Sequence, residues 1–375
     1  MKTKYKVIKQ AIKSRILEGV LTPHQKISSE SEMMRQFKVS RHTVRLAIGE
    51  LVSEGWLYRE QGSGTFCADR EHQINKQLLE QPQKSIAIIT TYISEYIFPS
   101  IIRGAESYLS KQGYHVSIFN TNNDHSQEKR ILETIITGNY QGVIVEPTLS
   151  AYANPNINYY LSLEKMKIPY LMINAAYEEL EPLSIELDDI QGGYKQVEHL
   201  INQGHQEIIG VYKTDDAQGK KRLKGYIKAH REYKIPINPK NIIAFSTHDF
   251  DDVISKVERL INENTLSTAI ACYNDQLVLI LLDLFREKGI EIPKDLSVVG
   301  YDDSILAELS EVKLTSIKHP KSIMGEDAAK IIISLIKKQN GVQSEAIKSI
   351  IYGAELVERN STKNRIGTSE IVVNS

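Results

Sequence analysis

Basic and hydrogen-bonding side chains crowd together just after position 40 of the sequence. Ser40 is followed by Arg41, His42, Thr43 and Arg45. If a helix starts here, these side chains occupy its first turns, which reach base edges and phosphates when a helix enters the major groove of DNA. Positive charge at a helix N-terminus is unfavourable because it opposes the helix dipole. A polyanion bound nearby would account for Arg41, so the chemistry predicted here is contact with DNA.

Polar side chains that directly follow apolar, strand-like runs form a second group. They are Tyr92, Asn120, Glu146, Asn174, Asn274, Asp275, Asp302, Asp303 and His319. Ligands of parallel sheets bind beyond the carboxyl ends of the strands, so these side chains are expected to converge on one cleft. Carboxylates and amides pair with vicinal hydroxyl groups, and Tyr92, Tyr96 and Phe98 could stack on C–H faces. The chemistry predicted is capture of a small neutral sugar; for any one residue, the alternative is a turn that closes the strand.

The glycines of the segment from Tyr58 to Phe66 could belong to a phosphate-binding loop or to a hairpin turn. A phosphate-binding loop joins a strand to a helix whose N-terminus faces the ligand. Here a second strand-like run follows the Gly-Ser-Gly sequence, which favours a β-hairpin. We therefore predict a wing, in which Arg59 and Gln61 would contact the DNA backbone or minor groove.

Helical periodicity and capping signals define the elements that position this wing. Apolar residues recur at helical spacing over residues 5–18. Ser29 and Glu32 have the spacing of a capping box, which predicts a second helix ending near residue 37. Ser40 is the predicted N-cap of a third helix that ends before Gly55. Two helices joined by a tight turn and followed by a hairpin indicate a winged helix-turn-helix.

Beyond a polar, glutamine-rich stretch at 69–84, strand-like and helix-like segments alternate from residue 85 to about residue 336. This alternation is typical of βαβ units and parallel sheets. Because the span is too long for one open sheet, we expect a two-lobed α/β body.

Charge supports a division of labour between the two parts. Residues 1–70 hold 13 Lys and Arg against 7 Asp and Glu, whereas the rest of the chain holds 33 against 40. A basic front end on an acidic body is expected when only the front end binds a polyanion.

No apolar run is long enough to span a membrane and no secretory signal is present, so a cytoplasmic protein is predicted. Two distant cysteines and ten scattered histidines predict no metal site.

The front end resembles the winged-helix domain of GntR-type regulators. The resemblance rests on Ser-Glu-x-x-Met at 29–33, Ser-Arg-x-Thr-Val-Arg at 40–45 and Gly-x-Gly-Thr-Phe at 62–66. It implies base and phosphate contacts from the third helix, wing contacts, and a backbone contact from the first helix. The candidate DNA-binding residues are Lys4, Tyr5, Ser40, Arg41, His42, Thr43, Arg45, Arg59, Gln61 and Gly62.

The body resembles the effector domain of LacI/GalR-type regulators, relatives of the periplasmic sugar-binding proteins. The matching stretches are 188–211, 221–230, 268–304 and 314–336. The resemblance implies that Arg222, in an Arg-x-x-Gly element, binds hydroxyl groups with its planar guanidinium. His319 stands where the family often has an amide. The candidate effector-binding residues are Tyr92, Tyr96, Phe98, Glu146, Asn174, Arg222, Asn274, Asp302 and His319.

A GntR-type head on a LacI-type body resembles the bacterial repressors of arabinose utilisation, which implies L-arabinose as effector. We expect a winged helix-turn-helix domain at 1–68, a linker at 69–84, an effector and dimerisation domain at 85–362 and a tail at 363–375. Its first lobe is expected from 85–185 and 316–342, and its second from 186–315 and 343–362.

The predicted function is a homodimeric repressor of a palindromic operator, released by sugar. Within this class, the alternatives are a regulator that responds to a different sugar, such as another pentose or a hexose, and activation instead of repression. The resemblance implies a dimer surface formed by the first helix of the first lobe and by the apolar helix after Asn274. For the helix after Asn274, the alternative is a fully buried core helix. An exported solute receptor is the competing class of binding protein. An enzyme that used Asp302, Asp303 and Glu146 as acid and base is the third class, and no nucleophile, orienting residue or metal cluster supports it.

Overall fold

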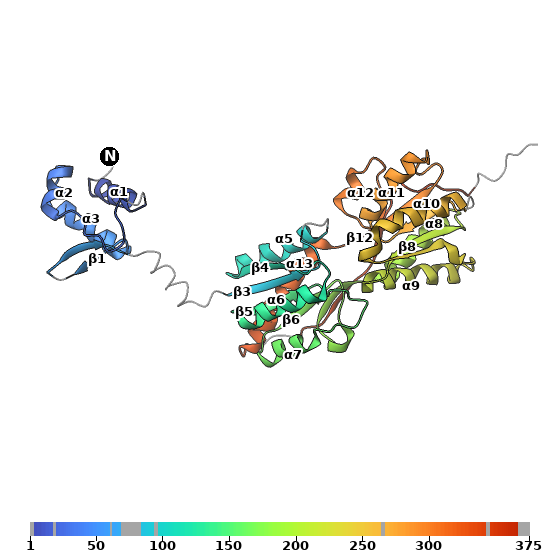
Figure 1. The fold of residues 1–375 in the computed structure, drawn as a ribbon, viewed down its shortest axis with the longest axis horizontal. Coiled ribbons are helices and arrows are strands. Elements are labelled where there is room, and N and C mark those ends of the chain that lie inside the picture. Colours follow the sequence, from blue (N-terminus) through green and yellow to red (C-terminus); the bar gives the residue numbers. More distant parts are fainter. Residues whose placement is uncertain are drawn as a thin grey trace, which may run out of the picture. The chain divides into compact units, whose positions relative to one another are not determined.

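The computed structural model describes residues 4–17, 20–60, 62–68, 84–93, 97–263, 267–342 and 346–366. The chain divides into two compact units, Met1–Gln83 and Lys84–Ser375, which we call the head and the body (Figure 1). The predicted fold class is confirmed, since a helix-turn-helix head with a hairpin precedes a two-lobed body of parallel sheets. None of the helices in the described ranges is long and apolar enough to cross a membrane.

The head is built from helices that local signals start and stop. Ser29 forms the predicted capping box with Glu32, and Ser40 accepts a hydrogen bond from the backbone N–H of Thr43. Lys38, between the second and third helices, takes a left-handed conformation with φ 50°, which makes the tight turn. The elements are α1 (Lys4–Leu17), α2 (Glu30–Phe37), α3 (Arg41–Ser53), β1 (Leu57–Glu60) and β2 (Gly64–Cys67).

The apolar faces of the three helices and the hairpin meet in one small core. Ile8 of α1, Val44 and Leu51 of α3, and Leu57 of β1 are all within 1% of full burial. β1 and β2 pair antiparallel with Glu60 opposite Gly64, so the glycine-rich segment is a hairpin turn as predicted. The hairpin leaves the outward face of α3 uncovered, because the core lies behind that helix.

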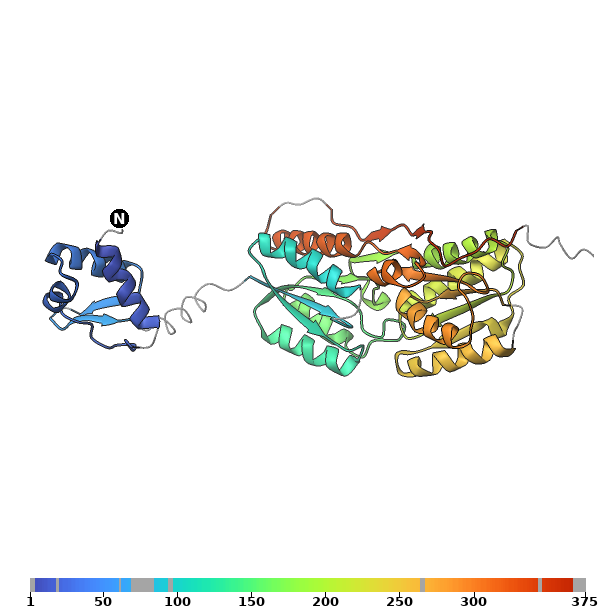
Figure 2. The same cartoon turned by 90° about the horizontal axis from the view of Figure 1, so that it is seen from above.

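The first lobe of the body is an all-parallel six-stranded sheet in the order β13-β7-β6-β5-β3-β4. Alternate residues of β3 face opposite layers: Ile86 and Ile88 pack against α5 and α13, whereas Ala87 and Ile89 pack against α6 and α7. Helices α5 and α13 lie side by side (Figure 2). The elements are β3 (Ser85–Thr90), α5 (Phe98–Lys111), β4 (His115–Asn120), α6 (His125–Thr137), β5 (Tyr140–Val145), α7 (Ile157–Lys165), β6 (Tyr170–Ile173), β7 (Ser184–Leu187), α13 (Lys321–Gln339) and β13 (Ile350–Tyr352).

The second lobe is a six-stranded sheet in the order β14-β12-β11-β10-β8-β9, parallel except for β14. Its elements are α8 (Asp189–Asn202), β8 (Ile208–Lys213), α9 (Ala217–Glu232), β9 (Ile242–Phe245), α10 (Phe250–Glu263), β10 (Ala269–Cys272), α11 (Asp275–Glu287), β11 (Ser297–Asp302), α12 (Ile305–Leu309), β12 (Thr315–Lys318) and β14 (Glu355–Val357). The carboxyl ends of the parallel strands in both lobes face the space between the lobes, so polar residues that follow those strands can share one cleft.

The chain passes between the lobes three times, after β7, after β12 and after β13, whereas the predicted crossings were near residues 185, 315 and 342. β12 belongs to the second lobe, because Thr315 pairs with Val299 of β11, so the chain crosses after Lys318. β13 belongs to the first lobe, because Ile350 pairs with Ile185 of β7. The start of the predicted tail is also bonded to the body, since the backbone N–H of Lys363 donates to Ser297 Oγ at 3.0 Å. Most of the predicted linker, residues 69–83, lies outside the described residues.

Candidate functional site

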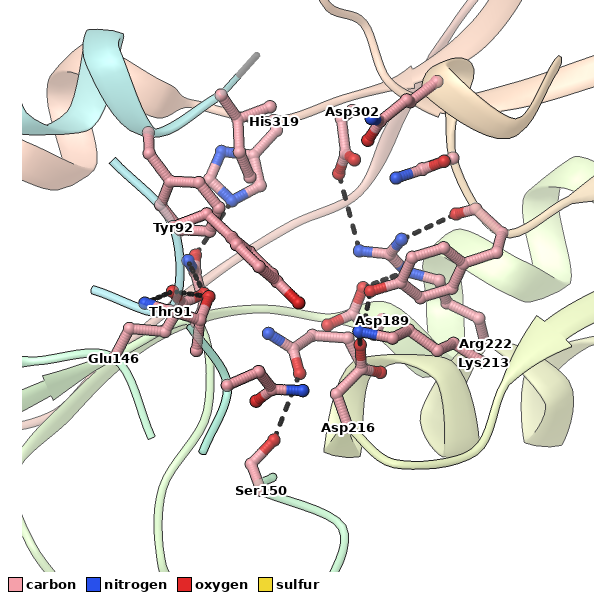
Figure 3. Close-up of a pocket in the computed structure, with 18 of the residues that line it drawn as sticks. Thr91, Tyr92, Glu146, Ser150, Asp189, Lys213, Asp216, Arg222, Asp302 and His319 are labelled. Carbon is pink, nitrogen blue, oxygen red and sulfur yellow. Dashed lines mark hydrogen bonds and ion pairs between the residues drawn. The ribbon is translucent and has the colours of Figure 1, made fainter. Parts of the chain in front are cut away.

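A cavity of about 300 Å³ lies between the two lobes of the body. Figure 3 shows Thr91, Tyr92 and Glu146 on one side of it, facing Asp189, Lys213 and Arg222 on the other. Of the candidate effector-binding residues, those that line the cavity are Tyr92, Phe98, Glu146, Asn174, Arg222, Asn274, Asp302 and His319. Tyr96 lies outside the described residues.

A buried carboxylate anchors the first-lobe wall of the cavity. Glu146 accepts hydrogen bonds from the Thr91 backbone N–H at 3.0 Å, from Thr91 Oγ1 at 2.6 Å and from Asn174 Nδ2 at 3.0 Å. Burial raises the pKa of Glu146, while these donors oppose the shift. Because Asn174 donates with its nitrogen, its oxygen is left to accept from His319 Nε2 at 3.1 Å. Burial lowers the pKa of His319 to about 4, so the ring is neutral at pH 7 and carries its proton on Nε2.

An arginine held between carboxylates and aromatic rings forms the second-lobe wall. Arg222 Nε donates to Asp189 Oδ1 at 2.8 Å, Nη1 donates to the Tyr273 carbonyl at 2.7 Å, and Nη2 lies 3.5 Å from Asp302 Oδ1. The guanidinium carbon stands 3.6 Å from the ring centroid of Tyr301. Burial alone would lower the pKa of Arg222, but the two carboxylates raise it overall. The guanidinium is therefore held in place by protein groups on the cavity wall.

Several charged residues of the cavity were not predicted from the sequence. Lys213 Nζ is 3.5 Å from Asp216 Oδ2, and the Tyr273 hydroxyl donates to that same carboxylate oxygen at 2.5 Å. Although burial disfavours its charge, the carboxylates of Asp216 and Asp215 raise the pKa of Lys213 overall. The signal was available, because Lys213 ends β8 and Asp189 follows β7, so both obey the same strand-end rule as the residues that were found.

Other strand-end residues bond to groups elsewhere in the body instead of lining the cavity. Asn120 donates its amide to Asn122 Oδ1 at 2.7 Å. The Asp275 carboxylate accepts from the Ser304 backbone N–H at 2.8 Å, and burial raises the pKa of Asp275 to about 7. Asp303 forms an ion pair with Arg359 at 2.7 Å. Asn274 does both, since its side chain caps α11 and also reaches the cavity.

Polar contacts join the lobes along the rim of the cavity. Asn123 Nδ2 donates to Thr247 Oγ1 at 3.0 Å. The Ala217 backbone N–H donates to Ser150 Oγ at 2.9 Å, and Lys220 Nζ donates to the Ala151 carbonyl at 2.6 Å. These contacts bridge the two lobes beside the cavity.

In the head, most of the candidate DNA-binding residues are exposed, and they lie on α1, α3 and the hairpin or next to them. The side chains of Arg41 and Arg45 are 58% and 61% exposed, and Arg45 Nε lies 3.0 Å from both carboxylate oxygens of Glu30. The residues that are exposed are Lys4, Ser40, Arg41, His42, Arg45, Arg59 and Gly62, while Tyr5 and Thr43 are half-buried. Gln61 lies outside the described residues. A hollow beside α3 adds Arg35 and Lys38, which the sequence reasoning did not select.

Among the residues that the structure describes, no group of three or more His, Cys, Asp or Glu side chains is arranged to hold a metal ion.

Comparison with known proteins covers both units of the chain. Residues 4–67 match the family described as bacterial regulatory proteins, gntR family, and residues 197–362 match the periplasmic binding protein-like domain. An arabinose metabolism transcriptional repressor from Halalkalibacterium halodurans is 57% identical over 365 residues, covering 96% of this chain and 97% of the relative. A repressor of the same description from Geobacillus stearothermophilus is 45% identical over 363 residues, covering 96% of this chain and 98% of that relative.

Solved structures resemble the body in fold. A LacI family transcriptional regulator from Enterococcus faecium with bound ribose gives a TM-score of 0.64 at 24% identity, covering 75% of this chain and 99% of that one. A complex of the transcriptional regulator CelR with cellobiose gives a TM-score of 0.65 at 19% identity, covering 89% of this chain and 100% of that one. At such identities the likeness concerns the fold alone.

Proposed function

The chain belongs to the family of the arabinose metabolism transcriptional repressors, and from this premise we propose that L-arabinose binds between the lobes of the body and releases the head from operator DNA. Like its relatives, the chain is a DNA-binding transcription regulator and not an enzyme. The observation that carries the proposal is the relation to a repressor at 57% identity over both units of the chain.

The size and charge of the cavity support a small neutral sugar as its ligand. Ligand pockets range over about 300–1,000 Å³, and a cavity of about 300 Å³ suits a monosaccharide better than an oligosaccharide. Two cations, Lys213 and Arg222, are outnumbered by the carboxylates that line the cavity, and His319 is neutral. These carboxylates are Glu146, Asp189, Asp216 and Asp302. An excess of negative charge disfavours sugar phosphates and sugar acids, while charged hydrogen-bonding groups suit hydroxyls.

Aromatic side chains support the same ligand class. Tyr92 and Phe98 lie together at the cavity with ring centroids 6.5 Å apart. Phe98 is the first residue of α5, and Tyr92 follows β3, so both come from the first lobe. Such rings offer apolar faces to the C–H groups of a sugar, opposite the polar groups of the second lobe.

Binding between the lobes gives the sugar a means to act on DNA binding. A ligand that contacts both walls favours the closed arrangement, because an open cavity leaves one set of contacts unmade. If the operator-bound state needs another arrangement, sugar and operator oppose each other with a coupling of about 1–3 kcal/mol, typical of allosteric proteins. We propose that the heads of a homodimer read a palindromic operator and that the sugar changes how the dimer presents them.

The dimer surface is part of this proposal. α11 buries Leu277, Val278 and Leu281 in the second-lobe core, so most of its apolar character serves the core. The adjacent α12 leaves Ile305 and Leu309 57% and 75% exposed. Exposed apolar side chains of this size suit a contact between copies of the chain.

The test uses a duplex selected by the full chain from a pool of random sequences. Fluorescence anisotropy is measured for the labelled duplex with and without saturating L-arabinose, with D-xylose and D-ribose as matched pentoses. We expect L-arabinose to lower the affinity for the duplex by about 5- to 150-fold, the range of the coupling above. Equal affinity with and without every pentose would refute the proposal.

A further inference from the structure

The turn that carries Asp302 adopts a backbone conformation that side chains disfavour. Asp302 and Asp303 have φ angles of 87° and 45°, so two successive residues with a Cβ atom lie in the left-handed region. This region is sterically unfavourable for such residues, although aspartate tolerates it better than most. The turn begins at Asp302, the last residue of β11, and brings the Asp302 carboxylate to the cavity, beside Arg222.

One ammonium group holds the carbonyls of both residues of this turn. Lys321 Nζ donates to the Asp302 carbonyl at 2.7 Å and to the Asp303 carbonyl at 2.8 Å. The His319 backbone N–H and Ser316 Oγ add bonds at 3.3 Å and 3.0 Å, but each reaches only one residue of the turn. Lys321 is the first residue of α13, which begins after the crossing that follows β12. From there its side chain bridges both residues of the strained turn.

A lysine at position 321 is energetically unfavourable unless its bonds to the turn compensate. A cation in the first turn of a helix opposes the helix dipole. Burial also lowers the pKa of Lys321, although the nearby carboxylates of Asp302, Asp303, Asp275 and Glu308 oppose the shift. A lysine on a solvent-facing turn would avoid both costs. The bonds to the two carbonyls are the compensating interaction in the structure.

We propose that Lys321 is a positioning residue of the sugar site, which fixes the turn so that the Asp302 carboxylate points into the cavity in its binding geometry. This inference rests on the proposed function. Lys321 does not line the cavity, so it acts on the sugar only through Asp302. Because Lys321 starts α13 of the first lobe, the sugar-contacting turn of the second lobe is tied to the crossing about which the lobes would move.

The chain offers a matched control at another crossing between the lobes. Lys195 is half-buried like Lys321, and its Nζ donates to the Ala354 carbonyl at 2.7 Å. Ala354 lies between β13 and β14 and is not part of the cavity. Lys195→Met therefore removes a partly buried lysine-to-carbonyl bond at a crossing without touching the turn of Asp302.

The experiment measures the dissociation constant of L-arabinose by calorimetry and the melting temperature without sugar for the full chain and its variants. We expect Lys321→Met to weaken sugar binding about tenfold, which is about 1.4 kcal/mol, with the sugar-free melting temperature close to that of Lys195→Met. Lys195→Met should bind sugar like the wild type. Lys321→Arg should retain most of the affinity, because a guanidinium can also donate to two carbonyls.

A double-mutant cycle separates positioning from a general structural role. In an Asp302→Asn background, Lys321→Met should cause little further loss, because the carboxylate that it positions is already gone. An undiminished loss in that background, or unchanged affinity in Lys321→Met, would overturn the assignment of Lys321. If the wild-type chain bound no arabinose, the proposed function itself would fail, and this assignment with it.

Discussion

Removing Arg222 should cost stability and sugar response together, and the two losses can be separated. The Arg222 guanidinium lies between the buried carboxylates of Asp189 and Asp302, at 2.8 and 3.5 Å. Asp189 is 2% exposed. Removing one partner of such a buried pair costs about 3–5 kcal/mol, because the remaining charge has no partner. We therefore expect Arg222→Met to lower the free energy of unfolding of the body by about 3–5 kcal/mol and to abolish binding of L-arabinose.

The double variant Arg222→Met/Asp189→Asn tests the physical cause. Neutralising Asp189 removes the unpaired charge, so most of the lost stability should return. Sugar binding should not return, since the guanidinium that faces the cavity is still missing. If the double variant were no more stable than Arg222→Met alone, the unpaired carboxylate would not be the source of the loss. If it bound L-arabinose, Arg222 would not be part of the sugar site.

The pH dependence of Arg222→Met provides a second check on the same cause. Burial raises the pKa of Asp189 even with Arg222 present, and removing the guanidinium raises that pKa further. In this variant, Asp189 stays protonated in the native state at pH values where it is already ionised in the unfolded chain, that is, above about 3.9, the ordinary pKa of aspartate. The stability of the variant must therefore fall as pH rises. Relative to wild type, the free energy of unfolding of Arg222→Met should increase as the pH is lowered from 7 to 5.

The assay can follow the two units separately in the full chain. Trp56 is the only tryptophan of the sequence and packs against the core of the head. Its fluorescence therefore reports unfolding of the head, while circular dichroism reports mainly the larger body. In urea titrations the fluorescence transition should be the same in wild type and variants. A shift of that transition would show that the substitution acts beyond the body.

Further expectations concern the head, the histidine and the autonomy of the body. Arg45→Ala should weaken operator binding and leave sugar affinity unchanged. If one phosphate contact is lost, the magnitude of the slope of log K against log salt should fall by about 0.9. An unchanged slope would argue for a base contact instead. His319→Gln should retain sugar affinity, because an amide can donate to Asn174. His319→Leu leaves that acceptor unpaired and should weaken the free energy of sugar binding by about 1–3 kcal/mol in calorimetry. Equal affinities of the two variants would contradict the role of this bond. The fragment 84–375 should bind L-arabinose like the full chain in calorimetry, since the body has its own cores; a fragment that unfolds or binds no sugar would contradict this autonomy.

The head could be predicted almost element by element because its signals are local. The capping box of Ser29 and the N-cap of Ser40 lie within a few residues of the helices that they start. Such caps work through hydrogen bonds to backbone groups of the first turn, so no distant contact is needed to identify them. The hairpin was likewise fixed by its glycines, with Glu60 pairing opposite Gly64.

The cavity could be predicted in part because strand ends are visible in the sequence while side-chain partners are not. The strand-end rule found Glu146 and Asp302, and it would also have found Lys213 had that strand been read. It could not tell Asp302, which faces the cavity, from Asp303, which pairs with Arg359 far along the chain. That choice depends on the turn conformation.

The lobe boundaries were missed for a related reason. β12 and β13, the two strands assigned to the wrong lobe, are four and three residues long, so they give little periodic signal. Their lobe is decided by pairing with β11 and β7, which their own short sequences do not show. Long-range pairing therefore decided where the chain crosses between lobes.

The contacts between the lobes are of a kind that a small ligand can outweigh. The bonds from Asn123 to Thr247 and from Lys220 to the Ala151 carbonyl lie at the rim, where water can replace them when the lobes part. Each such bond contributes about 0.5–1.5 kcal/mol net. A sugar that binds both Glu146 and Arg222 adds bonds of similar size to the closed state alone. An apolar, interlocked interface would favour the closed state whether or not sugar was bound, whereas a polar rim is consistent with the proposed control by sugar.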